Sequence, residues 1–138
     1  MKGAYIVQDV EGKPDLILLG TGSEVSLCVS AAKLMEGKKV RVVSMPSMEI
    51  FEEQSEEYKK SVLLEGVPVM GVEAGATHGW WRYTHYQVGI DQFGTSAPAV
   101  KGFEKMGLTA EVVASKATKV VAYYATHPVP PKMEEFGF

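Results

Sequence analysis

The sequence "DLILLGTGSEVSLCVSAAKLM", from Asp15 to Met35, decides the fold class of this chain. Its first part, Leu16–Leu19, is continuously apolar, as expected of a β-strand that is buried on both faces. A glycine-containing turn follows, and apolar residues then recur every three or four positions, which predicts one face of a helix. The residues of this face are Val25, Cys28, Val29, Ala32 and Met35. A buried strand that runs through a tight turn into a helix is typical of an α/β protein.

The same alternation continues along the rest of the chain. Further strands are predicted at residues 4–9, 39–45, 67–73 and 87–90. One broken or two short helices are predicted at residues 48–63, and further helices at residues 99–107 and 109–125. Residues 74–86 are expected to form a loop that leads into a short helix. The first strand is expected to form an antiparallel hairpin with Leu16–Leu19, because only a short turn with Gly12 and Pro14 separates the two. The other strands alternate with helices, which predicts a mostly parallel sheet covered on both faces.

Length and composition limit the possible classes of protein. The chain has 138 residues, of which 46% are hydrophobic, and this fits a single domain with a real core. The formal net charge is −3 with acids and bases interspersed, so we expect no binding to nucleic acid. No apolar run approaches the roughly 20 residues that span a bilayer, so we expect no membrane insertion. The single cysteine, Cys28, fits a reducing compartment, and a soluble, cytoplasmic domain is predicted.

The glycine turn after Leu19 has the arrangement of cradles that hold nucleotide phosphates. A P-loop needs a lysine followed directly by serine or threonine, and "GTGSEV" has no such pair because it has no lysine. The dinucleotide motif G-x-G-x-x-G/A matches at its first two glycines but has Val25 at its third position. The third possibility is an anion site made by the N–H groups at the start of the helix. In "TGSE", however, Thr21 and Glu24 are expected to form a capping box. The Glu24 carboxylate would then occupy the positive end of the helix and repel a phosphate. We therefore predict that this turn starts a helix and holds no phosphate.

Four blocks of the sequence resemble, in order and spacing, the C-terminal domain of transketolases. They are "PDLILLGTGSEVSL", "KVRVVSMPSMEIFEEQSEEYKKSVL", "VEAGATHGWWRY" and "GIDQFGTSAP". The resemblance covers roughly Gly3 to Ala117, and the family usually has a tryptophan where this chain has Met48. Residues 1–117 are expected to form the transketolase C-terminal-like domain, and residues 118–138 to extend the last helix and end in a Pro-rich tail. The resemblance implies a three-layer α/β/α fold with a five-stranded mixed sheet that has one antiparallel strand.

The resemblance also implies a biochemical context. Transketolases use thiamine diphosphate and a divalent cation, usually magnesium, to move a two-carbon ketol unit between sugar phosphates in the pentose phosphate pathway. They act as homodimers. The residues that bind cofactor and metal and activate the cofactor lie in two N-terminal domains of the family, and their G-D-G…N motif is absent here. We therefore expect no catalytic, cofactor-binding or metal-binding residue in this chain, no activity of the chain alone, and partner domains on the same or a separate chain.

The segment "EAGATHGWWRYTHY" holds the densest group of chemically capable side chains: Glu73, His78, Trp80, Trp81, Arg82 and His85. One interpretation is an acid/base pair of Glu73 and His78 at the carboxyl end of a parallel strand. A second is a metal site that uses both of these residues and His85. The third is a loop packed by the tryptophans, with His and Arg side chains that pair across a subunit contact, because aromatic residues and Arg are typical of interfaces. The pattern favours the third.

Two further functions remain open on the sequence. The first is an independent binding module for a small or regulatory ligand, which would need a pocket near Gly20–Ser23, Met45–Ser47 and Glu73–His78. The second is a stand-alone enzyme that uses Glu73 and His78. The favoured hypothesis is a non-catalytic transketolase domain that supports assembly and the dimer contact.

Overall fold

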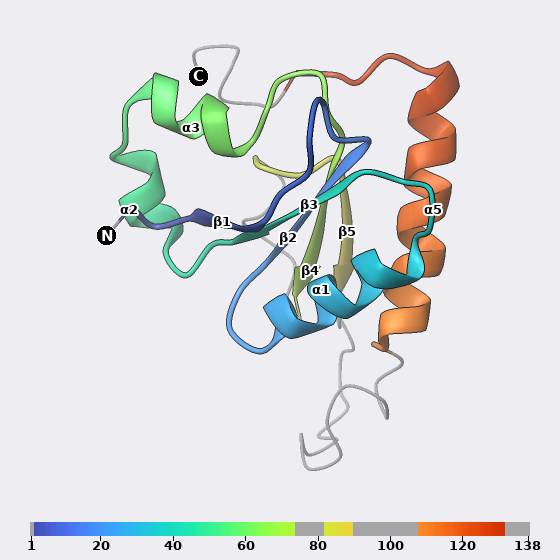
Figure 1. Cartoon of the computed structure of the whole chain (residues 1–138). Helices are drawn as coiled ribbons and strands as arrows, with labels where there is room; N and C mark the ends of the chain where they lie inside the picture. Colours follow the sequence, from blue (N-terminus) through green and yellow to red (C-terminus); the bar gives the residue numbers. More distant parts are fainter. Residues whose placement is uncertain (1, 74–81, 90–107, 132–138) are drawn as a thin grey trace, which may run out of the picture.

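The computed structural model describes residues 2–73, 82–89 and 108–131 (Figure 1). Its elements, in chain order, are β1 (Tyr5–Gln8), β2 (Leu16–Gly20), α1 (Glu24–Leu34), β3 (Val40–Ser44), α2 (Met48–Glu52), α3 (Glu56–Val62), β4 (Val69–Glu73), β5 (Tyr86–Gly89) and α5 (Ala110–Thr126). The strands form one sheet in the order β1-β3-β2-β4-β5. The expected five-stranded mixed sheet is therefore confirmed. Among the described helices, none is both long and apolar enough to cross a membrane.

The central strand β2 is buried on both faces, as its apolar run predicted. Leu16 and Leu18 belong to one core cluster, and Ile17 and Leu19 to the other. All four side chains are fully buried. Because side chains alternate along a strand, this one short segment supplies both halves of the hydrophobic core.

The expected hairpin between β1 and β2 is wrong. Strand β1 instead pairs antiparallel with β3, with Tyr5 opposite Ser44 and an irregularity between Ile6 and Gln8. Both edges of β2 are taken by parallel neighbours, β3 on one side and β4 on the other. The short turn therefore carries the chain past β3 instead of closing a hairpin, and β1 becomes an edge strand.

The helices cover the two faces of the sheet in pairs, which makes three layers (Figure 1). Helices α1 and α5 pack on one face and against each other, and α2 and α3 lie on the other. Residues 48–63, expected to form one broken or two short helices, form two short helices, α2 and α3, each capped by a serine side chain. The helix expected at residues 99–107 lies outside the described residues. Helix α5 runs unbroken past Ala117, and Val120 and Val121 in this stretch belong to the core. The first part of residues 118–138 is thus integral to the domain.

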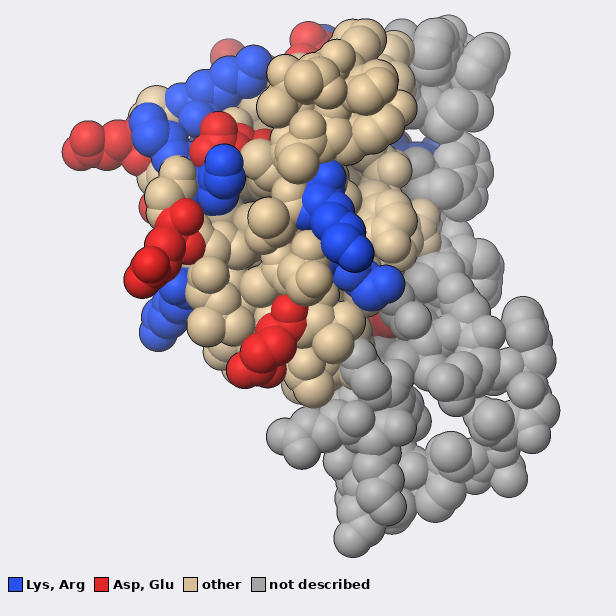
Figure 2. Space-filling model, turned by 90° about the vertical axis from the view of Figure 1, so that its right-hand side faces the viewer, with Lys and Arg blue, Asp and Glu red and all other residues tan. Residues whose placement is uncertain are grey.

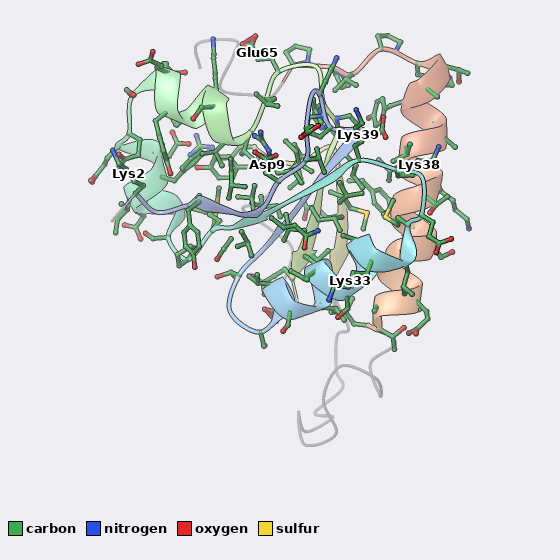
Figure 3. All side chains as sticks on the ribbon, in the orientation of Figure 1. Lys2, Asp9, Lys33, Lys38, Lys39 and Glu65 are labelled. Atoms are coloured by element: carbon green, nitrogen blue, oxygen red, sulfur yellow. The ribbon has the colours of Figure 1, made fainter. Side chains whose placement is uncertain are left out.

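A buried arginine joins β3 to α3 and to the segment after β1. The side chain of Arg41 is 9% exposed, and its Nη1 donates to the carbonyl oxygens of Ser61 (2.8 Å) and Val62 (3.0 Å). Its Nε and Nη2 donate to the two carboxylate oxygens of Asp9, at 2.9 and 3.3 Å. Figure 3 shows Asp9 between the sheet and α3, whereas Lys33 and Lys38 lie outward along α1 and the following loop. A charged residue inside the apolar run "VRVV" was the sequence signal for such a contact.

Replacing Arg41 with methionine should lower the free energy of unfolding by about 2–3 kcal/mol, because the buried Val62 carbonyl and the partly buried Ser61 carbonyl lose their donor and a carboxylate loses its partner. Urea denaturation measures this. The matched variant Asp9→Asn keeps the bonds to Ser61 and Val62 and should cost under about 1 kcal/mol. Burial would raise the pKa of Asp9, but the hydrogen bonds from Arg41 and the Val10 N–H and the Arg41 charge lower it overall. The stability that the pair of Asp9 and Arg41 contributes is therefore fully present above the ordinary pKa of the Asp9 carboxyl. It is lost as pH falls through the lowered pKa of the folded state. Equal losses of unfolding free energy in Arg41→Met and Asp9→Asn would contradict this account of the Arg41 contacts.

The thiol of Cys28 should be inert in the folded protein. The residue is fully buried in α1, and burial, with a smaller contribution from the Glu24 charge, raises the pKa of the thiol to about 12. A disulfide reagent such as Ellman's at mildly alkaline pH should label less than a few per cent of the protein in an hour and all of it in denaturant. Rapid labelling of the folded chain would contradict the buried placement.

Candidate functional site

The group of residues that the sequence singled out is divided between two places. Glu73 is the last residue of β4 and is half-buried, while Arg82 and His85 belong to the segment just before β5. His78, Trp80 and Trp81 lie outside the described residues. The acid/base pairing of Glu73 with His78 therefore stays a prediction. The short helix expected after the loop is not found at residues 82–85, which form a turn that leads directly into β5.

His85 lies at the opposite end of β4 from Glu73. Its Nδ1 accepts a hydrogen bond from the N–H of Val69 (3.0 Å), the first residue of that strand. Glu73 is four steps along the strand from Val69, or about 13 Å at 3.3 Å per residue. Glu73 and His85 therefore cannot ligate one metal ion, and the metal set that combined them is wrong. Among the described residues, no three His, Cys, Asp or Glu side chains gather closely enough to hold a metal.

The turn between β2 and α1 differs from the expected capping box. Helix α1 begins at Glu24 with Ser23 at the N-cap position, and Ser23 makes no side-chain capping bond. Gly22 has a φ of +57°, which is outside the helical range, so it cannot be the first helical residue after Thr21. Backbone bonds from the N–H of Glu24 to the Thr21 carbonyl and from Val25 to Gly22 close the turn instead. The prediction that Thr21 is the N-cap residue is therefore wrong, because the N-cap position is Ser23, two residues later.

The role predicted for the Glu24 carboxylate is compatible with this geometry. Glu24 is buried in the first turn of α1, and its Oε2 lies 3.9 Å from where a Cβ of Gly22 would stand. The carboxylate thus folds back over the turn at the positive helix end, where it opposes an incoming anion. A Cβ on Gly20 would approach the Cys28 sulfur at 3.1 Å and the Glu24 backbone at 3.3 Å. Close packing of helix on strand therefore explains Gly20 without a phosphate.

A groove of about 440 Å³ lies beside α2 and is lined by Met48, Glu49, Glu52, Arg82 and Tyr83. Tyr83 is fully buried, and its hydroxyl donates to the Glu52 carboxylate at 2.5 Å. The Arg82 guanidinium lies 5.8 Å from the centre of the Tyr83 ring, and the Arg82 Nε is buried without a hydrogen-bond partner in the described part of the chain. Met48, which replaces the usual tryptophan of the resembling family, is part of this wall.

A second groove, of about 430 Å³, lies between β5 and α5. Its lining combines a histidine and three tyrosines with two lysines and one valine: His85, Tyr86, Tyr123, Tyr124, Lys116, Lys119 and Val120. Tyr86 and Tyr123 are 42% and 53% exposed. Burial, with a smaller contribution from Tyr123, raises the pKa of Tyr124. Figure 2 shows basic and acidic side chains interspersed over this side of the molecule, with uncharged surface between them.

These features define a three-layer α/β domain. Within residues 2–73, 82–89 and 108–131, the polar clusters lie at different ends of the sheet and do not converge on one reaction centre. Residues 3–109 match the family model described as the transketolase-like TK C-terminal domain, and the chain belongs to this family.

Relatives and solved structures agree with this assignment. The chain is 50% identical to transketolase 1 of Saccharomyces cerevisiae over 125 residues, which are 89% of this chain and 18% of that protein. A probable transketolase of Schizosaccharomyces pombe is 45% identical over 131 residues. The structure of the Leishmania mexicana transketolase superposes with a TM-score of 0.89 at 43% identity and covers 98% of this chain and 20% of that one. The chain spans about a fifth of the length of these relatives.

The hydroxyl of Tyr83 should contribute measurably to stability. Its replacement by phenylalanine leaves the Glu52 carboxylate without this donor, and we expect unfolding to become easier by about 1–2 kcal/mol. Tyr86→Phe is the matched control, because its ring is 42% exposed, and it should change stability by less than about 0.5 kcal/mol. Thermal and urea unfolding of both variants provide the comparison. Equal effects would mean that the bond from Tyr83 to Glu52 contributes nothing.

Proposed function

We propose that this chain is the C-terminal, non-catalytic domain or subunit of a transketolase, and that it supports the assembly and the dimer contact of the enzyme. The observation that carries the proposal is the combination of family membership with length: the chain matches a fifth of each full relative. The parent enzyme would transfer a two-carbon ketol unit between sugar phosphates of the pentose phosphate pathway. One solved relative, from Pichia stipitis, is described as a complex with sedoheptulose 7-phosphate.

The chemistry of the described residues supports a non-catalytic role. Cys28 is buried with its pKa raised to about 12, so it is no nucleophile at neutral pH. Glu73 and His85 lie at opposite ends of β4 and cannot act on one substrate atom.

The described residues also do not fit thiamine diphosphate and its magnesium ion. A diphosphate needs backbone N–H donors that are free of a competing carboxylate, and Glu24 lies at the one glycine turn that resembles such a site. A magnesium ion needs a group of oxygen ligands, and the described part of the chain offers no group of three acidic or His side chains. We therefore assign both cofactors to the N-terminal domains, which would be supplied by the same or another chain.

Two features favour a contact with partner domains. The groove at Met48, Glu52 and Arg82 combines a buried arginine nitrogen with acidic and apolar walls, as is common in interfaces. The exposed rings of Tyr86 and Tyr123 are a second apolar surface. A split-gene transketolase chain, described as an inactive beta4 tetramer, shares the fold at 20% identity with a TM-score of 0.65.

The alternative function is a binding module for a small ligand on the same fold. The groove between β5 and α5 favours it, because two lysines and three tyrosines line a volume in the range of small-molecule sites. A thermal-shift screen with nucleotides and sugar phosphates separates the two functions. Stabilisation of several degrees by one compound, lost in Lys116→Ala, would support the module, and a uniformly negative screen would count against it.

A ketol-transfer assay tests the main proposal. The chain would be incubated with xylulose 5-phosphate, ribose 5-phosphate, thiamine diphosphate and magnesium, alone and after addition of a chain that carries the two N-terminal domains. We expect no turnover alone, because the described residues hold no reaction centre, and activity only in the mixture. The N-terminal chain alone is the control. Turnover by this chain alone would overturn the non-catalytic role, and an inactive mixture would count against the role in assembly.

A further inference from the structure

The feature that the proposed function leaves unused is the position of His85 between three separate parts of the chain. Both of its ring nitrogens are within hydrogen-bond distance of backbone groups: Nδ1 is 3.0 Å from the Val69 nitrogen, and Nε2 is 2.9 Å from the Pro130 oxygen. Its ring also meets the ring of Tyr124 on α5 edge to face, with centroids 5.9 Å apart. One imidazole thus connects the start of β4, the last helix and the segment that follows it.

The protonation state of this ring follows from the partners. An N–H can only donate, so Nδ1 must accept the bond from Val69 and carries no proton. A carbonyl oxygen can only accept, so Nε2 must carry the proton and donate a hydrogen bond to the Pro130 oxygen. The ring is therefore neutral in the Nε2–H tautomer. Since the backbone N–H of His85 also donates to the Val69 carbonyl (2.8 Å), the imidazole acts as the first acceptor of the ladder between β4 and β5.

The segment that His85 holds is short and rich in proline. Residues 128–131, "PVPP", follow the end of α5 and are here called the strap. Three of the four residues are prolines and have no N–H, so the strap can make few backbone bonds of its own. Val129 lies in a groove of about 260 Å³ that also includes Pro68, Val121 and Tyr124. The strap therefore crosses from α5 to the beginning of β4, and the bond from His85 to Pro130 fixes it there.

We propose that His85 is a pH-sensitive latch: neutral, it fastens the strap across the amino end of β4, and protonation of Nδ1 releases it. A proton on Nδ1 would point at the Val69 N–H, so two donors would face each other where a hydrogen bond had been. The ring must then turn away, and the bond to Pro130 is lost with it. Because the latched arrangement excludes the charged ring, acidification favours release.

Among the described residues, the charged groups around His85 do not favour a charged ring. The titratable and charged groups that line its own groove and the neighbouring groove under Val129, with His127 at the end of α5, are Lys116, Lys119, Tyr86, Tyr123, Tyr124, Lys13, Asp15 and His127. Of these, only Asp15 is acidic, and its carboxylate accepts from the Lys39 N–H at 2.8 Å. Lys116 and Lys119, which line the same groove as His85, would repel a second positive charge.

Nuclear magnetic resonance of the labelled 138-residue chain tests the latch. The imidazole nitrogen shifts should identify the Nε2–H tautomer of His85 at about pH 8. As pH is lowered toward about 5 and His85 titrates, the intrinsic-rate-corrected protection of the Val69 amide should fall by at least about tenfold, and the Val129 amide shift should move with the same midpoint. The Leu18 amide in β2 reports the global fold and should stay protected.

Two variants separate the latch from a general effect of acid. His85→Asn places a carbonyl oxygen near the Nδ1 position but cannot titrate or reach Pro130, so Val129 should have the released shift at every pH. His127→Asn removes the other histidine at this corner, which stacks on Tyr123, and should keep the wild-type response. An Nδ1–H tautomer, a Val69 amide that stays protected while His85 titrates, or an acid response that survives in His85→Asn would each overturn the proposal. Should His85→Asn fail to fold, the wild-type titration decides alone. None of these readouts depends on ketol transfer.

Discussion

The constraint on which the structure depends is the burial of β2 on both of its faces. Four consecutive apolar side chains, Leu16–Leu19, alternate between two core clusters, so the sheet needs helices on each side. Parallel neighbours occupy both edges of the strand. Every other described element is arranged around this segment: α1 and α5 cover one side, and α2 and α3 the other. The antiparallel β1 joins at the outer edge of β3.

The same architecture separates the polar groups that could have formed a reaction centre. Parallel strands gather residues at their two ends, and β4 has Glu73 at one end and the contact with His85 at the other. The glycine turn after β2 begins a tightly packed helix, with a carboxylate over its first amides. The described polar side chains instead form short hydrogen bonds between structural elements, such as those of Arg41 between β3 and α3 and that of Tyr83 to α2.

Histidine is used here in a backbone role. The ring of His85 replaces a strand carbonyl as the acceptor for Val69, and it does so at the point where the C-terminal strap crosses the sheet. A strap made largely of proline has few donors, so its attachment depends on side-chain bonds and on packing of Val129. Titration of one ring would therefore release the strap while leaving the core intact, because the core residues of β2 are fully buried and the strand is paired with β3 on one side and β4 on the other.

The sequence by itself determined the elements and the family. Apolar runs and helical spacing located the strands and the described helices, because these periods reflect which faces are buried. Four ordered blocks were enough to predict the transketolase C-terminal domain and its mixed sheet, which the family match and the solved relatives confirm. The buried role of Cys28 also followed from its place in the apolar helix face.

Only the tertiary structure decided which strands pair and where side chains meet. Local spacing suggested a hairpin of β1 with β2, but pairing is set by which edges remain free after the parallel strands assemble. The "TGSE" pattern predicted a capping box, yet the positive φ of Gly22 shifted the start of the helix by two residues. Glu73 and His85 are 12 positions apart in the sequence. Nothing in this spacing indicated that the chain would place His85 at the opposite end of β4 from Glu73. Such contacts depend on the path of the chain between elements, which the local pattern of residues does not encode.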